Sequence, residues 1–192
     1  MDRFNRGGEL GGMNTLHPGA LLLAHPALLD PNFSRSVILL SAHSEEEGSI
    51  GLILNRPIGQ TLGEFDPELA ESSLADVPLY TGGPVAKEQL ILVAWKWSEE
   101  ESAFKLYFGI DGERAERILL EDNGFRIRGF LGRAGWTSGQ LDAELGQNSW
   151  VLSASLPALK DNEDMIDWHQ LLCMERPELR LLADAPEEPS LN

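Results

Sequence analysis

Two apolar segments, residues 90–97 and 104–108, constrain the fold of this 192-residue chain more than any other feature. They flank the polar stretch Ser98-Glu99-Glu100-Glu101-Ser102. Both segments alternate apolar with polar side chains, as in Trp95-Lys96-Trp97 and Phe104-Lys105-Leu106. Alternation of this kind is the period of a β-strand with one buried face. The two segments therefore predict an antiparallel pair of strands.

Shorter apolar runs bounded by glycine or proline predict the remaining strands. Residues 37–40 and 50–54 flank a polar, glycine-ended loop, which favours a second hairpin. Asn55-Arg56-Pro57 ends this hairpin, because proline removes a donor from the ladder. Further strands are expected at residues 20–24, 77–80, 125–131 and 150–154. In the third of these, alternation places Arg126 and Arg128 on one face and Ile127 on the other.

Helical signals occur between these strands. Ala115, Ile118 and Leu119 follow helical spacing, and Gly124 is a stop signal. Two more helices are expected at residues 138–145 and 164–174, and Glu64 stands three residues after Thr61, as in a capping box. Strands and helices intermix without a regular βαβ alternation. We therefore expect an α+β fold, a single compact domain with a mixed, largely antiparallel sheet, hairpins and flanking helices.

Charge and composition divide the chain further. There are 15 Lys+Arg against 31 Asp+Glu, a formal charge of −16 at pH 7, which disfavours binding to DNA and to anionic membranes. Residues 161–192 hold 2 of the bases and 9 of the acids, so much of the acidity serves solubility. We expect a flexible extension at residues 1–14, one domain at 15–183, and an acidic, disordered tail at 184–192.

Cys173 is the only cysteine, so the chain can form no internal disulfide, which is typical of a reducing compartment. Its neighbours Leu171, Leu172 and Met174 are apolar and predict a buried core thiol. The longest aliphatic run near the start, residues 20–24, falls far short of the roughly 20 residues of a membrane span. We expect a cytoplasmic protein that does not bind membranes.

Motifs of catalysis and cofactor binding are missing from the sequence. There is no phosphate loop, no dinucleotide glycine fingerprint and no Gly-x-Ser-x-Gly elbow. His43 with Glu45 and Glu47 has the residue types of a cation site, but a solvated acidic turn explains these residues better. We expect no cofactor, no metal and no catalytic residue of a known type.

Four corners rich in glycine, proline or polar residues stand beside strand ends, where backbone N–H groups can face a ligand. They are residues 25–33, 55–57, 81–84 and 132–141. The last corner leads into a predicted helix N-terminus, which suits an anion. Alternatively, the glycines only permit tight turns and Trp136 belongs to the core. The ligand-binding candidates are Asp30, Asn55, Arg56, Gly82, Gly83, Arg133, Gly135, Trp136, Gln140 and Glu144.

The same corners carry a resemblance to a known family. Five motifs occur in order: Gly19-Ala20-Leu21-Leu22-Leu23-Ala24-His25-Pro26, Asp30-x-x-Phe33-x-x-Ser36-Val37, Gly48-x-x-Gly51-Leu52-Ile53-Leu54-Asn55-Arg56-Pro57, Tyr80-x-Gly82-Gly83-Pro84-Val85 and Gly135-Trp136-x-x-Gly139-Gln140-Leu141-x-x-Glu144. Through them the sequence resembles the YqgE/AlgH family of bacterial proteins. The resemblance implies a cytosolic, single-domain α+β protein without an established molecular function or catalytic residues. One branch of the family is linked by name to transcriptional regulation of alginate production.

Our main hypothesis is a regulatory or ligand-binding protein whose partner is a protein or a small molecule, in preference to an enzyme. Its recognition surface would combine the corners at residues 55–56, 82–83 and 135–140. Several polar and glycine corners in a chain without a catalytic motif favour this function.

Two alternatives remain open. An unrecognised enzyme acting on a small anionic substrate would use Asp30 or Glu144 as general acid or base, with Arg56 or Arg133 holding the substrate. A transcriptional regulator would act indirectly, because Arg126, Arg128 and Arg133 are too few to track a phosphate backbone.

Overall fold

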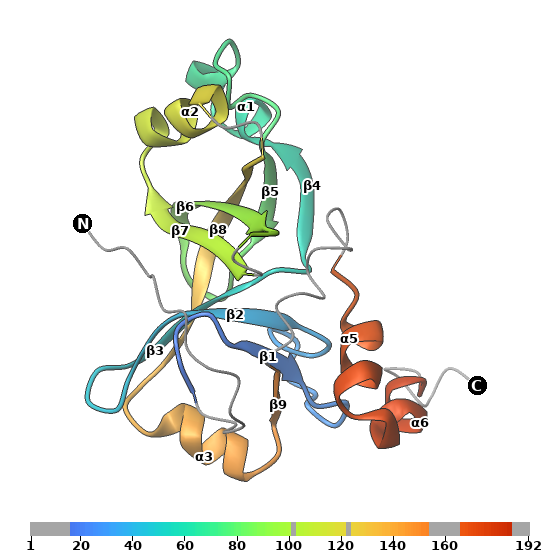
Figure 1. Ribbon diagram of the computed structural model, residues 1–192. Coiled ribbons are helices and arrows are strands. Elements are labelled where there is room, and N and C mark those ends of the chain that lie inside the picture. Colours follow the sequence, from blue (N-terminus) through green and yellow to red (C-terminus); the bar gives the residue numbers. More distant parts are fainter. Residues whose placement is uncertain (1–15, 101–102, 122–123, 154–165, 186–192) are drawn as a thin grey trace.

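The computed structural model describes residues 16–100, 103–121, 124–153 and 166–185, and its strands build one curled sheet (Figure 1). The strand order is β4-β5-β8-β3-β2-β1-β9, with β6 pairing with both β7 and β8. The predicted extension at residues 1–14 lies outside the described residues, and so does the predicted tail at 184–192 except for residues 184 and 185. The strands are β1 (Leu21–Ala24), β2 (Val37–Ser44), β3 (Gly48–Ile53), β4 (Pro57–Thr61), β5 (Pro78–Thr81), β6 (Val85–Ser98), β7 (Ala103–Ile110), β8 (Arg126–Trp136) and β9 (Trp150–Ser153).

β8 joins the two halves of the sheet. Its residues from Arg126 to Arg133 pair antiparallel with β6, and Gly129 to Leu131 pair with β5 in the one parallel ladder among the described strands. Its last residues, Ala134 to Trp136, pair antiparallel with β3. In Figure 1, β4 to β7 lie in the upper half of the molecule, and β1, β2, β3 and β9 lie in the lower half. The predicted α+β class with a largely antiparallel sheet in a single compact domain is confirmed.

Both predicted hairpins are present. In the β6–β7 pair, Trp95 stands opposite Leu106 and Trp97 opposite Phe104. β2 and β3 form the other hairpin. β4 was not predicted, because its sequence Pro-Ile-Gly-Gln-Thr lacks an apolar period and its residues are exposed or half-buried.

The first four described helices lie close to their predicted positions, and the fifth, at residues 180–183, was not predicted. They are α1 (Leu62–Phe65), α2 (Gly112–Glu121), α3 (Gln140–Gly146), α5 (Trp168–Glu175) and α6 (Arg180–Ala183), with 3₁₀ turns at Pro67–Leu69 and Pro177–Leu179. The Thr61 N–H donates to the Glu64 carboxylate at 2.8 Å, which confirms the capping contact. On α5, the buried residues are Trp168, Leu171 and Leu172. Cys173 lies beside that face and is only partly buried, so the prediction of a core thiol is wrong.

The core forms on both faces of the lower sheet. Leu21 and Leu23 of β1 belong to a cluster that includes Leu171 and Leu172 of α5. Leu22 belongs to a second cluster with Leu141 of α3 and two tryptophans. Because a strand buried on both faces needs apolar side chains at every position, β1 is a continuous leucine run.

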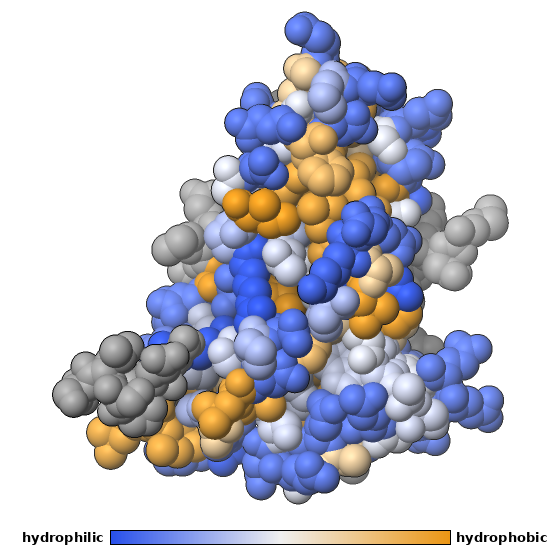
Figure 2. Space-filling view, turned by 180° about the vertical axis from the view of Figure 1, so that it is seen from behind, coloured by the Kyte–Doolittle hydropathy of each residue, from blue (hydrophilic) through white to orange (hydrophobic). Residues whose placement is uncertain are grey.

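A third apolar cluster fills the upper half and includes Leu62 of α1, Leu79 of β5 and Ala115 of α2. Seen from behind, hydrophobic residues form a patch in the upper middle of the molecule, others lie at the middle right and lower left, and hydrophilic residues cover much of the remaining surface (Figure 2). Among the described helices, none is both long and apolar enough to cross a membrane.

Candidate functional site

The connection between β1 and β2, residues 25–36, is built from turns and is called the β1–β2 loop below. Asp30 organises its centre. The Asp30 carboxylate accepts from the Asn32 N–H at 2.8 Å, and its carbonyl accepts from the N–H groups of Phe33 and Ser34 at 2.9 and 2.7 Å. A short acidic side chain that bonds the backbone two residues on is a frequent way to start a turn.

Asn55 binds the end of this loop from the corner after β3. Its Oδ1 accepts from the Val37 N–H at 2.9 Å, and its Nδ2 donates to the Arg35 carbonyl at 2.9 Å. Arg35 has a φ of 53°, in the left-handed region that is costly for a residue with a Cβ. The two hydrogen bonds of Asn55 lie on either side of this costly conformation and therefore stabilise it.

Arg56 binds the middle of the same loop. Its guanidinium donates to the carbonyls of Pro31 at 3.2 Å and Ser34 at 3.1 Å. Its own carbonyl accepts from the Thr81 N–H at 2.8 Å. The last residue of β5 therefore supports the residue that holds the loop.

Gly82 and Gly83 let the corner after β5 approach β8 closely. The Gly82 N–H donates to the Leu131 carbonyl at 2.8 Å. A Cβ on Gly82 would lie 2.2 Å from the Gly132 carbonyl oxygen, and one on Gly83 would lie 2.2 Å from the Arg133 carbonyl carbon. Gly83 also has a φ of 151°, so both positions require glycine for packing reasons.

Glu144 of α3 connects the last group of candidates. One carboxylate oxygen accepts from the indole N–H of Trp136 at 2.9 Å and of Trp150 at 2.7 Å, and the other accepts from Gln140 Nε2 at 2.9 Å. The Gln140 Oε1 in turn accepts from the Thr137 N–H at 3.0 Å. These contacts fix the start of α3 against the sheet.

Phe33 joins this aromatic group to the β1–β2 loop. Its ring lies 6.3 Å from that of Trp136, nearly parallel at 25°, and 5.7 Å from that of Trp150, edge-on at 76°. Aromatic pairs in these arrangements contribute about 0.5–1.5 kcal/mol each beyond their buried area. The loop therefore packs against tryptophans of β8 and β9, which Glu144 of α3 holds, and it is also bonded by the corner after β3.

α5 holds the two ends of the loop. The Trp168 indole N–H donates to the Ala24 carbonyl at 2.8 Å, and the Arg35 guanidinium lies over the Trp168 ring at 5.5 Å. Arg35 also donates to the Ala185 carbonyl at 2.7 Å. Within this braced frame, residues 29–32 at the loop tip are exposed, and Leu29 is 79% exposed.

The structure therefore sorts the ten candidates by position. Arg133 donates to Gln89 at 2.9 Å, and Gly135 pairs with Ile50 in the β3–β8 ladder, so these two candidates face other partners. Of the others, Asp30 is part of the loop, Asn55 and Arg56 bond it, and Trp136 packs against its Phe33. Glu144 bonds Trp136 and Gln140, and Gly82 and Gly83 follow Thr81, whose N–H donates to the Arg56 carbonyl. Sequence reasoning missed Leu29, and the Asp30-x-Asn32 turn signal beside it was the available clue.

His25 begins the loop, and its Nδ1 accepts from the Ala27 N–H at 3.2 Å. Burial, and to a smaller extent the Arg176 guanidinium, lower the pKa of His25 below its ordinary value of 6.5. Because the folded state then binds a proton less readily than the unfolded state, stability is kept above pH 6.5 and falls as the pH drops through the lowered pKa. We expect unfolding free energies, measured by urea titration in that range, to fall more steeply in the wild type than in His25→Gln.

A cleft of about 400 Å³ lies beside β9. Polar Asn148, Glu175 and Arg176 share its lining with apolar Leu145, Trp150, Val151 and Leu152. Among the described residues, no group of three or more His, Cys, Asp or Glu side chains is arranged to hold a metal ion.

Together, the fold and these contacts define a small α+β protein with one curled sheet. Side chains from separate parts of the sheet hold one surface loop in place. The chain belongs to the DUF179 (AlgH-like) family, whose model matches residues 21–177. The resemblance seen in the five motifs is thereby confirmed. No biochemical activity is established for this family.

Relatives and solved structures agree with this assignment. A UPF0301 protein of Chlorobaculum tepidum is 35% identical over 92% of this chain and 96% of its own, and one of Streptomyces coelicolor is 34% identical over 91% and 94%. The crystal structure of protein DIP2367 from Corynebacterium diphtheriae has a TM-score of 0.69 at 25% identity, covering 91% of this chain and 95% of that one. The solution structure of the AlgH protein from Pseudomonas aeruginosa has a TM-score of 0.60 at 28% identity, covering 88% and 94%.

Proposed function

We propose that this chain is a regulatory, partner-binding protein whose contact element is the β1–β2 loop. One observation carries the proposal: a loop without helix or strand is held by side chains from the corner after β3, by tryptophans of β8 and β9, and by Trp168 of α5, while its tip at residues 29–32 faces solvent. A loop that is already ordered loses less conformational entropy when it binds. Loops held by a rigid scaffold are frequent sites of recognition.

The loop tip favours a protein partner. Leu29 offers an apolar side chain at the surface, and Asp30 beside it adds a negative charge. An apolar contact surrounded by polar groups is typical of protein interfaces. The matching partner surface therefore holds a small apolar hollow with a basic or N–H donor group at its edge. We place this binding in the cytoplasm, where a lone thiol stays reduced.

Regulation through a protein fits the charges better than contact with DNA. Arg128 is only 5% exposed, with its guanidinium 4.6 Å from the Tyr80 ring and 4.8 Å from the Trp95 ring. Arg128 is therefore enclosed by aromatic rings, whereas Arg126 on the same strand is exposed. Arg133 donates to Gln89, so Arg128 and Arg133 both interact with other side chains of the protein.

The proposal is tested by changing the loop tip without changing the residues that hold the loop in place. Leu29→Asp is expected to weaken partner binding by about tenfold or more, because an apolar interface contact is replaced by a solvated charge. The melting temperature should stay at the wild-type value, since Leu29 is 79% exposed. The partner is first isolated by affinity capture from cell extract, and its dissociation constant is then measured with purified components by calorimetry.

Leu120→Asp is the matched control, because Leu120 on α2 is also 79% exposed. It should bind the partner as the wild type does. Arg56→Ala should lower both binding and melting temperature, because it releases the carbonyls of Pro31 and Ser34. If Leu29→Asp and Leu120→Asp bind the partner equally well, the β1–β2 loop is not the contact element.

A further inference from the structure

The cleft beside β9 lies along an edge of the sheet. β9 is the last strand in the sheet order, and among the described strands it pairs with β1 alone. The cleft, of about 400 Å³, is lined by Leu145 and Asn148 from the end of α3 and by Glu175 and Arg176 from the end of α5. Residues 150–152 of β9 line it between these two helix ends. Because a strand edge is a template for a further strand, this edge can pair with one more extended chain.

The register of β9 on β1 decides which backbone groups face the cleft. The Ala24 N–H donates to the Ser36 carbonyl at 3.0 Å, on the side of β2. Ala24 stands opposite Trp150. In an antiparallel pair, two opposite residues turn their backbone groups either both toward each other or both apart. Trp150, and Leu152 two residues further on, therefore turn their N–H and C=O groups away from β1, toward the cleft that both residues line.

The two faces of β9 give the cleft two different walls. Leu152 and Leu145 pack against the apolar cluster under α3, so this wall is apolar. On the other face, the Ser153 hydroxyl donates to the Glu175 carboxylate at 2.5 Å, which joins β9 to the end of α5. Arg176 follows Glu175 and is exposed. A strand added to β9 would thus meet apolar side chains on one face and charged side chains on the other.

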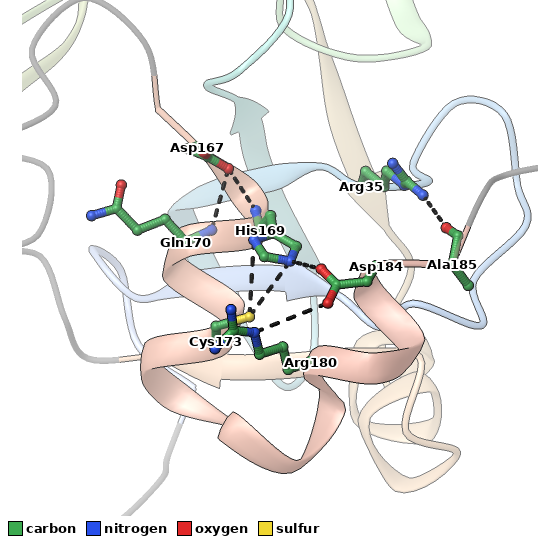
Figure 3. Close-up of polar contacts among 8 residues, drawn as sticks. All are labelled: Arg35, Asp167, His169, Gln170, Cys173, Arg180, Asp184 and Ala185. Carbon is green, nitrogen blue, oxygen red and sulfur yellow. Dashed lines mark hydrogen bonds and ion pairs between the residues drawn. The ribbon is translucent and has the colours of Figure 1, made fainter.

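The contacts of α5 fix the charged wall before anything binds (Figure 3). The Asp167 carboxylate caps the helix by accepting from the His169 N–H at 2.8 Å. His169 Nε2 lies 2.6 Å from an Asp184 carboxylate oxygen, which joins α5 to the residue after α6. The Arg35 guanidinium donates to the Ala185 carbonyl at 2.7 Å, so this region is also joined to the β1–β2 loop. A wall that is already ordered loses less conformational entropy when a ligand binds.

We propose that this cleft binds an extended segment of a partner protein, which adds to β9 as a further strand. Peptide groups of the segment bond the N–H and C=O groups of Trp150 and Leu152. Because side chains alternate along a strand, the segment carries apolar residues toward Leu145 and an acidic residue between them toward Arg176. The Arg176 Nε donates to Glu178, and the other guanidinium nitrogens supply the donors for this second carboxylate.

A second copy of this chain fits the cleft less well than a short segment does. Each chain carries a formal charge of −16, so two copies repel each other. A segment with a single acidic residue meets far less repulsion. β9 is four residues long and its edge lies between two helix ends, which suits one extended chain better than the sheet edge of a second folded domain.

The test uses seven-residue peptides that are selected from a random display library on the full chain and then synthesised. We expect the selected peptides to alternate apolar residues with an acidic one. Leu152→Pro removes an N–H that faces the cleft and leaves the β1 ladder intact, as proline can at a sheet edge. This change should weaken peptide binding, measured by calorimetry, about tenfold more than Leu152→Ala, which shortens the same side chain but keeps the N–H.

Changes in the peptide repeat this test without altering the protein. N-methylation of every second peptide group should weaken binding about tenfold in one phase of the alternation and leave it unchanged in the other. Replacing the acidic residue by its amide should weaken binding to the wild type but not to Arg176→Gln. Arg180→Gln, which changes another exposed arginine, is the control and should keep the preference for the acid. Leu29→Asp should bind the peptides as the wild type does, because the β1–β2 loop tip is a separate site.

Three results would overturn the proposal. The first is a library that yields no binding peptide, and the second is equal binding of the peptides to Leu152→Pro and Leu152→Ala together with tolerance of N-methylation at every position. The third is a dimer of the wild-type chain in sedimentation that Leu152→Pro separates into monomers, which would assign the edge of β9 to a second copy.

Discussion

Glu144→Ala is expected to lower the free energy of unfolding by about 3 kcal/mol, because two buried indole N–H groups lose their acceptor. Trp136 and Trp150 donate to the same carboxylate oxygen, and their side chains are 5% and 4% exposed. Water therefore has little room to replace the lost partner. Urea unfolding followed by tryptophan fluorescence and by circular dichroism measures the change, with an unaltered m-value showing that only stability has shifted.

Two further variants separate the parts of this network. Glu144→Gln should cost less than Glu144→Ala, because an amide oxygen still accepts from an indole N–H while the amide NH₂ faces another donor. Gln140→Ala should cost at most about 1 kcal/mol, since it removes a more exposed hydrogen bond. If Glu144→Ala unfolds at the same urea concentration as the wild type, the carboxylate is not held for structure. That result would favour the alternative in which Glu144 is a general acid or base.

The parts of the fold that the sequence predicts are those that depend on residues close together in the sequence. Alternation in β6 and β7 and the Thr61–Glu64 capping contact both depend on residues a few positions apart, and both predictions are confirmed. The burial of Arg128 could not be predicted in this way. β8 has neighbours on both edges and is covered on both faces, so alternation does not place a polar residue in solvent there.

For the candidate site, the sequence singled out residues but could not show what their side chains contact. Asn55 was chosen because a polar residue at a strand end often faces a ligand, yet it bonds Arg35 and Val37, 20 and 18 positions away. Only the packing of β2 against β3 brings those groups together. A one-dimensional pattern carries no signal for such a contact. The loop held by these side chains could therefore be recognised only in three dimensions.

Gly83→Ala is expected to have the largest effect on stability, a loss of about 4 kcal/mol or more in the free energy of unfolding. The added methyl group would lie 2.2 Å from the carbonyl carbon and 2.4 Å from the carbonyl oxygen of Arg133, both of them backbone atoms that cannot rotate away. The φ of 151° adds backbone strain to this clash. Thermal unfolding and urea titration of the soluble fraction measure the loss.

Gly146→Ala is the matched control, because a Cβ there meets no atom within 4 Å. It should leave stability unchanged or raise it slightly, as expected when alanine replaces glycine at a helical position. The corner at Gly83 also supports Arg56 through the Thr81 N–H, and Arg56 holds the β1–β2 loop. Gly83→Ala should therefore weaken partner binding together with stability, whereas Leu29→Asp weakens binding alone. Equal stability of Gly83→Ala and Gly146→Ala would show that the corner adapts to a side chain, and that the bracing of the loop does not depend on this close approach to β8.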